Sequence, residues 1–134
     1  MKQLVFLDTV GMLATWDRSD QWHHNARRAY SLLEPTSTTP LSTTLVLAEC
    51  GNALARTSFR ARVDEFRKHL EATGNLVWPT AEDWRAAWAA YRGGRFDQAG
   101  LVDQVSFVVM RRLDITQSFT NDRHFRAAGF ETLF

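Results

Sequence analysis

The chain has 134 residues, of which 45% are hydrophobic, so it is long enough for one substantial core and too short for two ordinary domains. Its 16 basic and 15 acidic residues nearly cancel, which excludes a strong overall field for nucleic acid. The single cysteine, Cys50, excludes an internal disulfide, and no apolar run approaches the roughly 20 residues of a membrane helix. We expect one soluble, cytoplasmic domain over residues 1–134, without a membrane partner.

The first element is the apolar run of residues 4–7, which ends abruptly at Asp8 and Thr9. A run this short and wholly apolar is typical of a strand that is buried on both faces in a parallel sheet. Ligands of open α/β sheets bind at the carboxyl ends of the strands. Asp8 is therefore the first candidate for a functional side chain.

Apolar periodicity and turn chemistry predict the elements of the first half. They are a helix over residues 10–15, a helix that begins after Asp20, a linker over residues 34–40, a very short strand over residues 41–43, and a helix capped by Thr44 that runs to about Arg56. On that last helix, Glu49, Asn52 and Arg56 follow one polar stripe, and Glu49 borders the apolar face. Taken alone, Glu49 is more simply interpreted as an ordinary solvated side chain.

The same patterns predict the elements of the second half. They are a helix capped by Thr57 or Ser58 and closed by Gly74, a strand over residues 75–78, a helix that follows a Thr80–Asp83 capping box and buries Trp84, Ala87, Trp88 and Tyr91, a loop over residues 95–100 that carries Asp97, a helix from Leu101, a strand over residues 117–120, a helix over residues 123–128 and a last strand over residues 130–134.

Alternating strands and helices imply right-handed crossovers and a parallel sheet, with acidic residues at one edge. Asp122 follows the strand at residues 117–120, so it neighbours Asp8 if the two strands are adjacent. Asp103 lies in the first turn of a helix, where the helix dipole alone also explains a carboxylate. With Glu49, these residues can form a ring of four carboxylates, which is costly without a divalent cation. Oxygen ligands favour Mg²⁺ or Mn²⁺, and such a centre suits phosphodiester cleavage.

Four segments also carry a family resemblance: Val5-Phe6-Leu7-Asp8-Thr9, Val46-Leu47-Ala48-Glu49 with Asn52 and Leu54, Asp97 with Leu101-Val102-Asp103 and Ser106-Phe107-Val108-Val109-Met110, and Phe119-Thr120-Asn121-Asp122-Arg123-His124-Phe125 with Ala128-Gly129-Phe130. Together they resemble the PIN-domain family, and the small single-domain form is similar to the VapC-type toxins of bacterial toxin–antitoxin pairs. The resemblance implies an α/β fold with a parallel five-stranded sheet flanked by helices on both faces. It also implies a metal-dependent endoribonuclease whose four acids match Asp8, Glu49, Asp103 and Asp122.

Under this hypothesis Asp8, Asp103 and Asp122 hold one Mg²⁺, and Glu49 assists and orients the attacking water. The sequence departs from its relatives beside Asp103, where Val102 replaces a frequent Thr or Ser and Gln104 is bulky. Candidates for holding the acids in place are Thr9, Asn52, Asp97, Thr120 and Asn121, and candidates for binding the RNA backbone are Arg56, Arg95 and Arg123.

Two other classes of protein share parts of this pattern. A phosphoacceptor receiver domain needs a lysine late in the chain, and no lysine follows Lys68. A catalytically degenerate PIN domain that only binds RNA or protein is the stronger alternative, although a binding module gains nothing from four repelling acids. The large side chains exceed what so small a domain easily buries, so we expect some to line a homodimer face or a groove for a small antitoxin: Trp22, Tyr30, Phe59, Phe66 and Trp88.

Overall fold

The computed structural model describes residues 3–33 and 36–134. The elements in these ranges are β1 (Gln3–Leu7), α1 (Thr9–Trp16), α2 (His23–Leu33), β2 (Thr38–Thr43), α3 (Thr44–Ala53), α4 (Arg60–Thr73), β3 (Leu76–Val77), α5 (Ala81–Arg92), α6 (Arg95–Gln98), α7 (Leu101–Arg112), β4 (Gln117–Phe119), α8 (Arg123–Ala127) and β5 (Glu131–Thr132). No helix in these ranges combines the length and the apolar character needed to cross a membrane.

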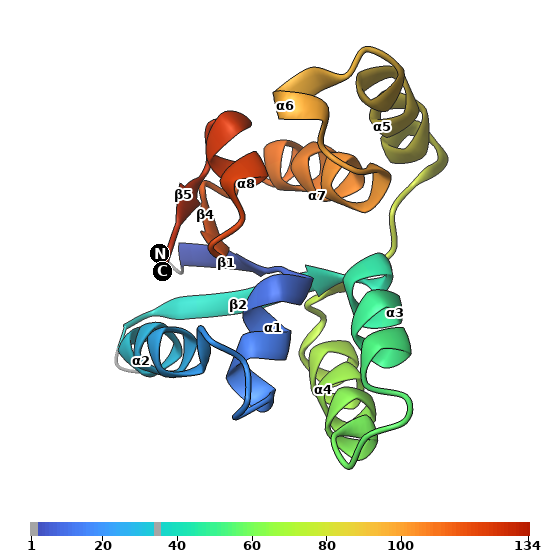
Figure 1. The fold of residues 1–134 in the computed structure, drawn as a ribbon. Coiled ribbons are helices and arrows are strands. Elements are labelled where there is room, and N and C mark those ends of the chain that lie inside the picture. Colours follow the sequence, from blue (N-terminus) through green and yellow to red (C-terminus); the bar gives the residue numbers. More distant parts are fainter. Residues whose placement is uncertain (1–2, 34–35) are drawn as a thin grey trace.

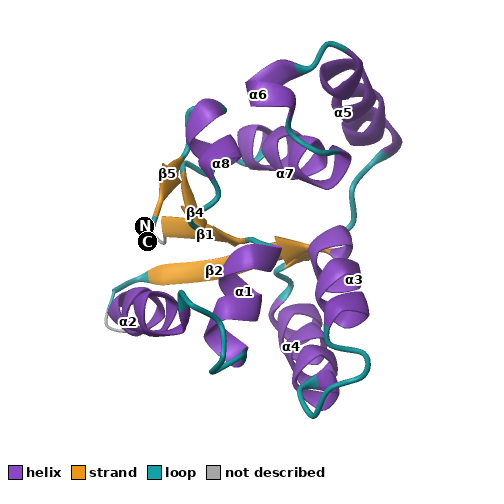
Figure 2. Ribbon diagram, in the orientation of Figure 1, coloured by secondary structure: helices purple, strands orange, loops and turns teal. Residues whose placement is uncertain are grey.

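The five strands form one sheet in the order β3-β2-β1-β4-β5, and every neighbouring pair is parallel. Helices α1 to α4 lie on one side of this sheet and α5 to α8 on the other (Figure 1; Figure 2). The central strand is β1, in which Val5, Phe6 and Leu7 are fully buried. The prediction of a parallel five-stranded α/β fold, with the first apolar run at its centre, is therefore confirmed.

Strand β2 is longer than predicted. It begins at Thr38, so part of the predicted linker is a strand, while residues 34–35 of that linker lie outside the described residues. Pro40 pairs with Val5 of β1, whereas β3 pairs only with Ser42 and Thr43. At Pro40, β2 is therefore paired with β1 on one side and unpaired on the other. A sheet tolerates proline at such an unpaired edge, because proline has no N–H to donate.

Three helices differ from the prediction. Helix α4 begins at Arg60 after Phe59, without a side-chain cap, and not at the predicted cap Thr57 or Ser58. Helix α3 is capped by Thr43 instead of Thr44, because the Thr43 hydroxyl accepts a hydrogen bond from the Val46 N–H, and the helix ends at Ala53, short of Arg56. The capping box of α5 is confirmed, but only half of its predicted stripe is buried. Ala87 is buried and Trp84 is half-buried, whereas Trp88 is 51% exposed and Tyr91 48%. Helix α5 buries Ala87 against α7 and leaves these two rings uncovered.

The predicted loop at residues 95–100 contains a short left-handed turn, α6. Its residues Phe96, Asp97 and Gln98 have φ values of 58°, 58° and 56°. A left-handed turn of L-residues costs about 1–2 kcal/mol per residue, so tertiary contacts must hold it. The Gln104 side chain does so by donating hydrogen bonds to the carbonyls of Arg95 and Ala99. This turn is thereby fixed beside the start of α7.

Gly11 lets α1 approach the end of β4. A Cβ atom at Gly11 would lie 2.1 Å from the carbonyl oxygen of Phe119 and 2.6 Å from the Phe119 ring. Only glycine permits this contact. The contact brings the start of α1, and Asp8 before it, against the end of β4.

Candidate functional site

The strand order brings three of the predicted acids to one edge of the sheet. Asp8 follows β1 and is the N-cap residue of α1, while Asp122 follows β4 and is the N-cap residue of α8. Strands β1 and β4 are hydrogen-bonded neighbours, as the prediction required. Asp103 lies in the first turn of α7.

Thr120 links the first two acids. Its buried hydroxyl donates a hydrogen bond to Oδ2 of Asp8 at 2.9 Å and accepts one from the backbone N–H of Asp122 at 3.1 Å. The hydroxyl at Thr120 therefore fixes the Asp8 carboxylate relative to the backbone that carries Asp122.

Asp103, Asp122 and His124 form the tightest cluster. One potential ligand atom from each lies within 4.8 Å of the others. The backbone N–H of His124 donates to Oδ1 of Asp122 at 2.9 Å, and its ring Nδ1 lies 2.8 Å from the same oxygen. No role was predicted for His124 from the sequence. Its position two residues after a helix N-cap carboxylate is the signal that places its ring beside that carboxylate.

The electrostatics of this cluster are unbalanced. Burial, and then the charge of Asp103, raise the pKa of Asp8 to about 8. Burial, followed by the charges of Asp122 and Glu49, raises the pKa of Asp103 to about 7. In the described part of the chain, no lysine or arginine forms an ion pair with Asp8, Asp103 or Asp122. A bound cation would relieve this repulsion.

Glu49 approaches the cluster from α3. Its side chain is exposed, and its Oε1 accepts a hydrogen bond of 2.6 Å from the hydroxyl of Thr9 at the start of α1. Its charge contributes to the raised pKa of Asp103. Glu49 therefore belongs electrostatically to the acidic group, at its solvent-facing side.

The remaining candidates are spread around this edge. Asp97 forms an exposed ion pair with Arg123, the first residue of α8, with 3.4 Å between Oδ2 and Nε. The guanidinium of Arg95 lies 4.7 Å from the centre of the Phe96 ring in the left-handed turn. Asn121 directly precedes Asp122, and its side chain is half-buried. These residues lie on α6, on α8 and in the segment before α8.

Two candidates lie elsewhere. Asn52 lines a groove between α3 and α4, together with Leu47 and Val63. Arg56 is exposed beyond the end of α3. The structure therefore does not place Asn52 or Arg56 among the residues that contact the acids.

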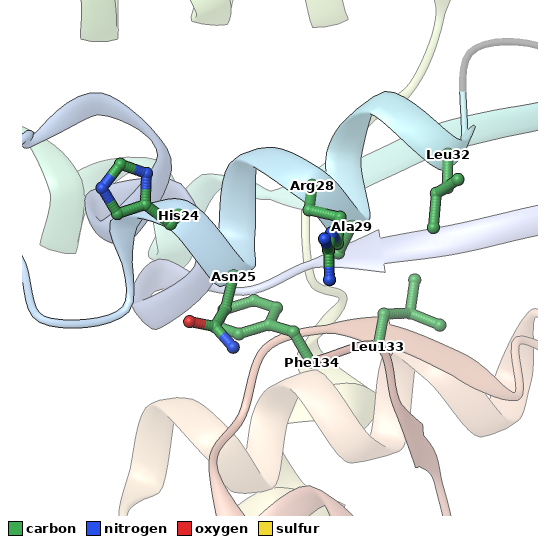
Figure 3. Close-up of a pocket in the computed structure, with 7 residues that line it drawn as sticks. All are labelled: His24, Asn25, Arg28, Ala29, Leu32, Leu133 and Phe134. Atoms are coloured by element: carbon green, nitrogen blue, oxygen red, sulfur yellow. The ribbon is translucent and has the colours of Figure 1, made fainter.

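Another cavity, between α2 and the C-terminal residues, has a different character. Its walls include His24, Arg28, Leu32 and Phe134, and none of the four acids lines it (Figure 3). In the close-up, the Phe134 ring lies opposite Asn25 and Ala29 of α2. The acidic edge, in contrast, combines converging titratable groups with raised pKa values, which is typical of functional sites.

The donor atoms of the acidic edge fit a hard divalent cation. Carboxylate oxygens suit Mg²⁺ and Mn²⁺, and the imidazole of His124 adds a donor that Mn²⁺ accepts more readily than Mg²⁺. Thr120 and His124 already orient two of the carboxylates through hydrogen bonds. Orienting partners of this kind are common around metal ligands.

The raised pKa values predict how the stability of the metal-free protein depends on pH. Asp8 and Asp103 prefer to be neutral in the fold, but in the unfolded chain they ionise near the ordinary aspartate pKa of 3.8. The stability that these neutral carboxyl groups allow is therefore fully present below pH 3.8. It is lost as the pH rises towards about 8 for Asp8 and about 7 for Asp103. Urea unfolding in a chelator should give a lower free energy of unfolding at about pH 8 than at about pH 5. A constant or rising stability over this interval would contradict the pKa assignment.

No protein-family model matches the sequence, and a search of curated proteins also finds no match. The structure, however, is similar to VapC20 of Mycobacterium tuberculosis, a toxin that cleaves the sarcin-ricin loop. The TM-score is 0.78 at 25% sequence identity, over 94% of this chain and 95% of that chain.

Two further solved structures share the fold. FitAcB from Neisseria gonorrhoeae has a TM-score of 0.60 at 16% identity, over 97% of this chain and 96% of that chain. FitAB bound to the IR36 DNA fragment has a TM-score of 0.65 at 16% identity, over 96% and 92%. These similarities extend over nearly the whole of each chain. In its parallel five-stranded sheet, and over nearly its whole length, the chain has the PIN-like fold of VapC20.

Proposed function

We propose that this protein is a metal-dependent endoribonuclease and the toxin of a toxin–antitoxin pair. The observation that carries the proposal is the group of converging acids, Asp8, Asp103 and Asp122, which no lysine or arginine of the described residues neutralises. The similarity to VapC20, a toxin that cleaves the sarcin-ricin loop, supports the assignment of the reaction.

In this proposal Asp8, Asp103 and Asp122 hold Mg²⁺ or Mn²⁺, and Glu49 assists. When bound, such an ion stabilises the charge that develops on a phosphodiester and lowers the pKa of a water molecule. Thr120 keeps the Asp8 carboxylate in place through its 2.9 Å hydrogen bond. Glu49 lies at the solvent-facing side, where a carboxylate can orient the attacking water and accept its proton.

The RNA backbone is proposed to pass over the rim of this site. Arg123 follows Asp122 directly, and Arg95 lies on the turn that carries Asp97, the ion-pair partner of Arg123. Both side chains are exposed, and α6 contacts α8, the helix that Asp122 caps. Their guanidinium groups suit phosphate contacts, which position RNA without reading its sequence. Arg56, beyond the end of α3, is a third candidate that lies further along the surface.

A small antitoxin is the proposed protein partner. The groove between α3 and α4 has a volume of about 550 Å³ and is lined by apolar residues, including Leu47, Val63 and Trp78, which is 72% exposed. An apolar groove of this kind suits an amphipathic segment. The exposed Trp88 and Tyr91 of α5 are candidates for a homodimer face. The similarity to VapC20, a toxin, supports the partnership.

A divalent ion should stabilise the fold and support cleavage. Because a ligand that binds only the folded state stabilises it by mass action, a 100-fold excess of Mn²⁺ over its dissociation constant adds about 2.7 kcal/mol. The melting temperature should rise on addition of Mn²⁺ or Mg²⁺ and return on chelation, while NaCl of matched ionic strength serves as the control. Chelation should also stop the cleavage of RNA. A melting temperature that neither ion changes would contradict the metal site.

A further inference from the structure

A concentration of positive charge lies in a hollow at the far end of α1, away from the acids. Two adjoining cavities of about 450 and 260 Å³ share the wall residues Thr15, Trp16, Arg27 and Arg62. Arg18 lines the larger one. We call the residues Arg18, Arg27 and Arg62 the arginine pocket.

The three arginines come from different elements. Arg18 lies between α1 and α2, Arg27 on α2 and Arg62 on α4. None of them forms an ion pair within the described residues, although Arg67, on the same helix as Arg62, pairs with two acids. An ordinary solvated helix face would not converge from three elements on one cavity. The arrangement concentrates positive charge in a concave site, which attracts anions.

The acids that flank these arginines in the sequence do not line the two cavities: Asp64 of α4 pairs with Arg67 and Lys68, and Glu65 lines neither cavity. The acids beside Arg18 are held by neighbouring residues. Oδ1 of Asp17 accepts hydrogen bonds from the backbone and hydroxyl of Ser19, and Oδ1 of Asp20 accepts one from the backbone of Trp22. Neither acid lines the cavities. The larger cavity also contains His23, whose Nδ1 lies 2.8 Å from the carbonyl oxygen of Ala14 and therefore donates to it.

We infer that the arginine pocket binds a backbone phosphate of the RNA substrate, at a distance from the cleavage site, an inference that rests on the proposed function. A guanidinium group can donate two parallel hydrogen bonds to the oxygens of one phosphate. Trp16 and Phe59 also line the larger cavity, and grooves that bind single-stranded nucleic acid combine basic with aromatic side chains in this way. Asp8 directly precedes α1 and Trp16 ends this helix of 8 residues, so about 12 Å of helix separates the two sites. The RNA would then run along α1.

The test compares the double variant Arg27→Gln, Arg62→Gln with the control Arg85→Gln, which removes an exposed arginine of α5. Binding of a labelled single-stranded RNA is measured by fluorescence anisotropy in a chelator, at several salt concentrations. Because each phosphate contact contributes about 0.7 to the salt dependence of log K for a single strand, loss of the one phosphate in the pocket should lower the slope of the double variant by about 0.7. Its affinity at low salt should fall by at least about tenfold, while the control follows the wild type.

Equal affinity and slope for the double variant and the control, with both variants folded by circular dichroism, would overturn the inference. The inference also fails if inorganic phosphate raises the melting temperature through these arginines but RNA binding is unchanged, or if only an acidic protein partner depends on them. Because the binding assay is done in a chelator, it measures RNA binding independently of cleavage at the acids. A reduced salt slope in the double variant, together with a wild type that never cuts RNA, would support the arginine pocket and contradict the nuclease assignment. An unchanged slope, together with a wild type that cuts RNA, would contradict the arginine pocket and support the nuclease assignment.

Discussion

Asp103→Asn is expected to lower RNA cleavage by at least about a hundredfold, since even the partners that orient metal ligands contribute about 10- to 100-fold. The metal-free variant should be as stable as the wild type or more stable. Burial and the charges of Asp122 and Glu49 oppose ionisation of Asp103, so a neutral amide relieves repulsion. Cleavage rates and urea unfolding in a chelator measure the two effects.

A matched control for this substitution is Asp114→Asn. Asp114 is exposed, has a φ of 56° that asparagine also accepts, and follows the far end of α7. The 12 residues of α7 separate it from the start of the helix by about 18 Å. This variant should retain the cleavage rate of the wild type. An active Asp103→Asn variant, or one that loses activity because it unfolds, would count against the role of Asp103.

Gly11→Ala is expected to have the largest effect on stability. The new methyl group would lie 2.1 Å from the Phe119 carbonyl oxygen, a backbone atom that cannot rotate away. Helix α1 would have to move away from β4, and with it the hydrogen bond between Asp8 and Thr120. We expect a loss of more than about 3 kcal/mol, which is a large share of the 5–15 kcal/mol typical of domains. Urea unfolding measures it.

Gly51→Ala is the matched control for that substitution. Gly51 also lies inside a helix, α3, but an added Cβ meets no atom within 4 Å. Alanine should therefore stabilise the protein by about 0.5–1 kcal/mol through its better helix propensity. Similar free energies of unfolding for Gly11→Ala and Gly51→Ala would contradict the claim that the close approach of α1 to β4 requires glycine at position 11.

The core of the fold was predictable because local patterns and the sheet agree. The apolar run before Asp8 has the composition of a buried central strand, and β1 occupies that place. The aromatic stripe of α5 was misinterpreted for a physical reason. Helical spacing shows that Trp88 and Tyr91 share a face, but it does not show whether another element covers that face. Pro40 favoured a linker for a similar reason. A strand accepts a proline only where its neighbour does not pair, and the sequence does not show that β3 pairs only with Ser42 and Thr43.

The convergence of the acids followed from the topology, whereas its fine structure did not. Parallel strands place Asp8 and Asp122 at one edge in any such fold. The left-handed turn at Phe96 has positive φ values at residues that are not glycine, so no glycine in the sequence predicts it. It depends instead on the side chain of Gln104, nine residues after Arg95, whose backbone carbonyl accepts its hydrogen bond. The role of Thr120 as a link between two acids needs the three-dimensional contact.

The most direct measurement is the cleavage of a labelled RNA by the purified chain, with the wild type and Asp103→Asn assayed side by side. Each protein is assayed with Mn²⁺, with a chelator, and after Mn²⁺ is added back in excess. We expect cleavage by the wild type with Mn²⁺, none in the chelator, recovery on re-addition, and none by the variant. Equal cleavage by the chelated wild type, or by folded Asp103→Asn, would contradict the claim that these acids form a metal-dependent nuclease site.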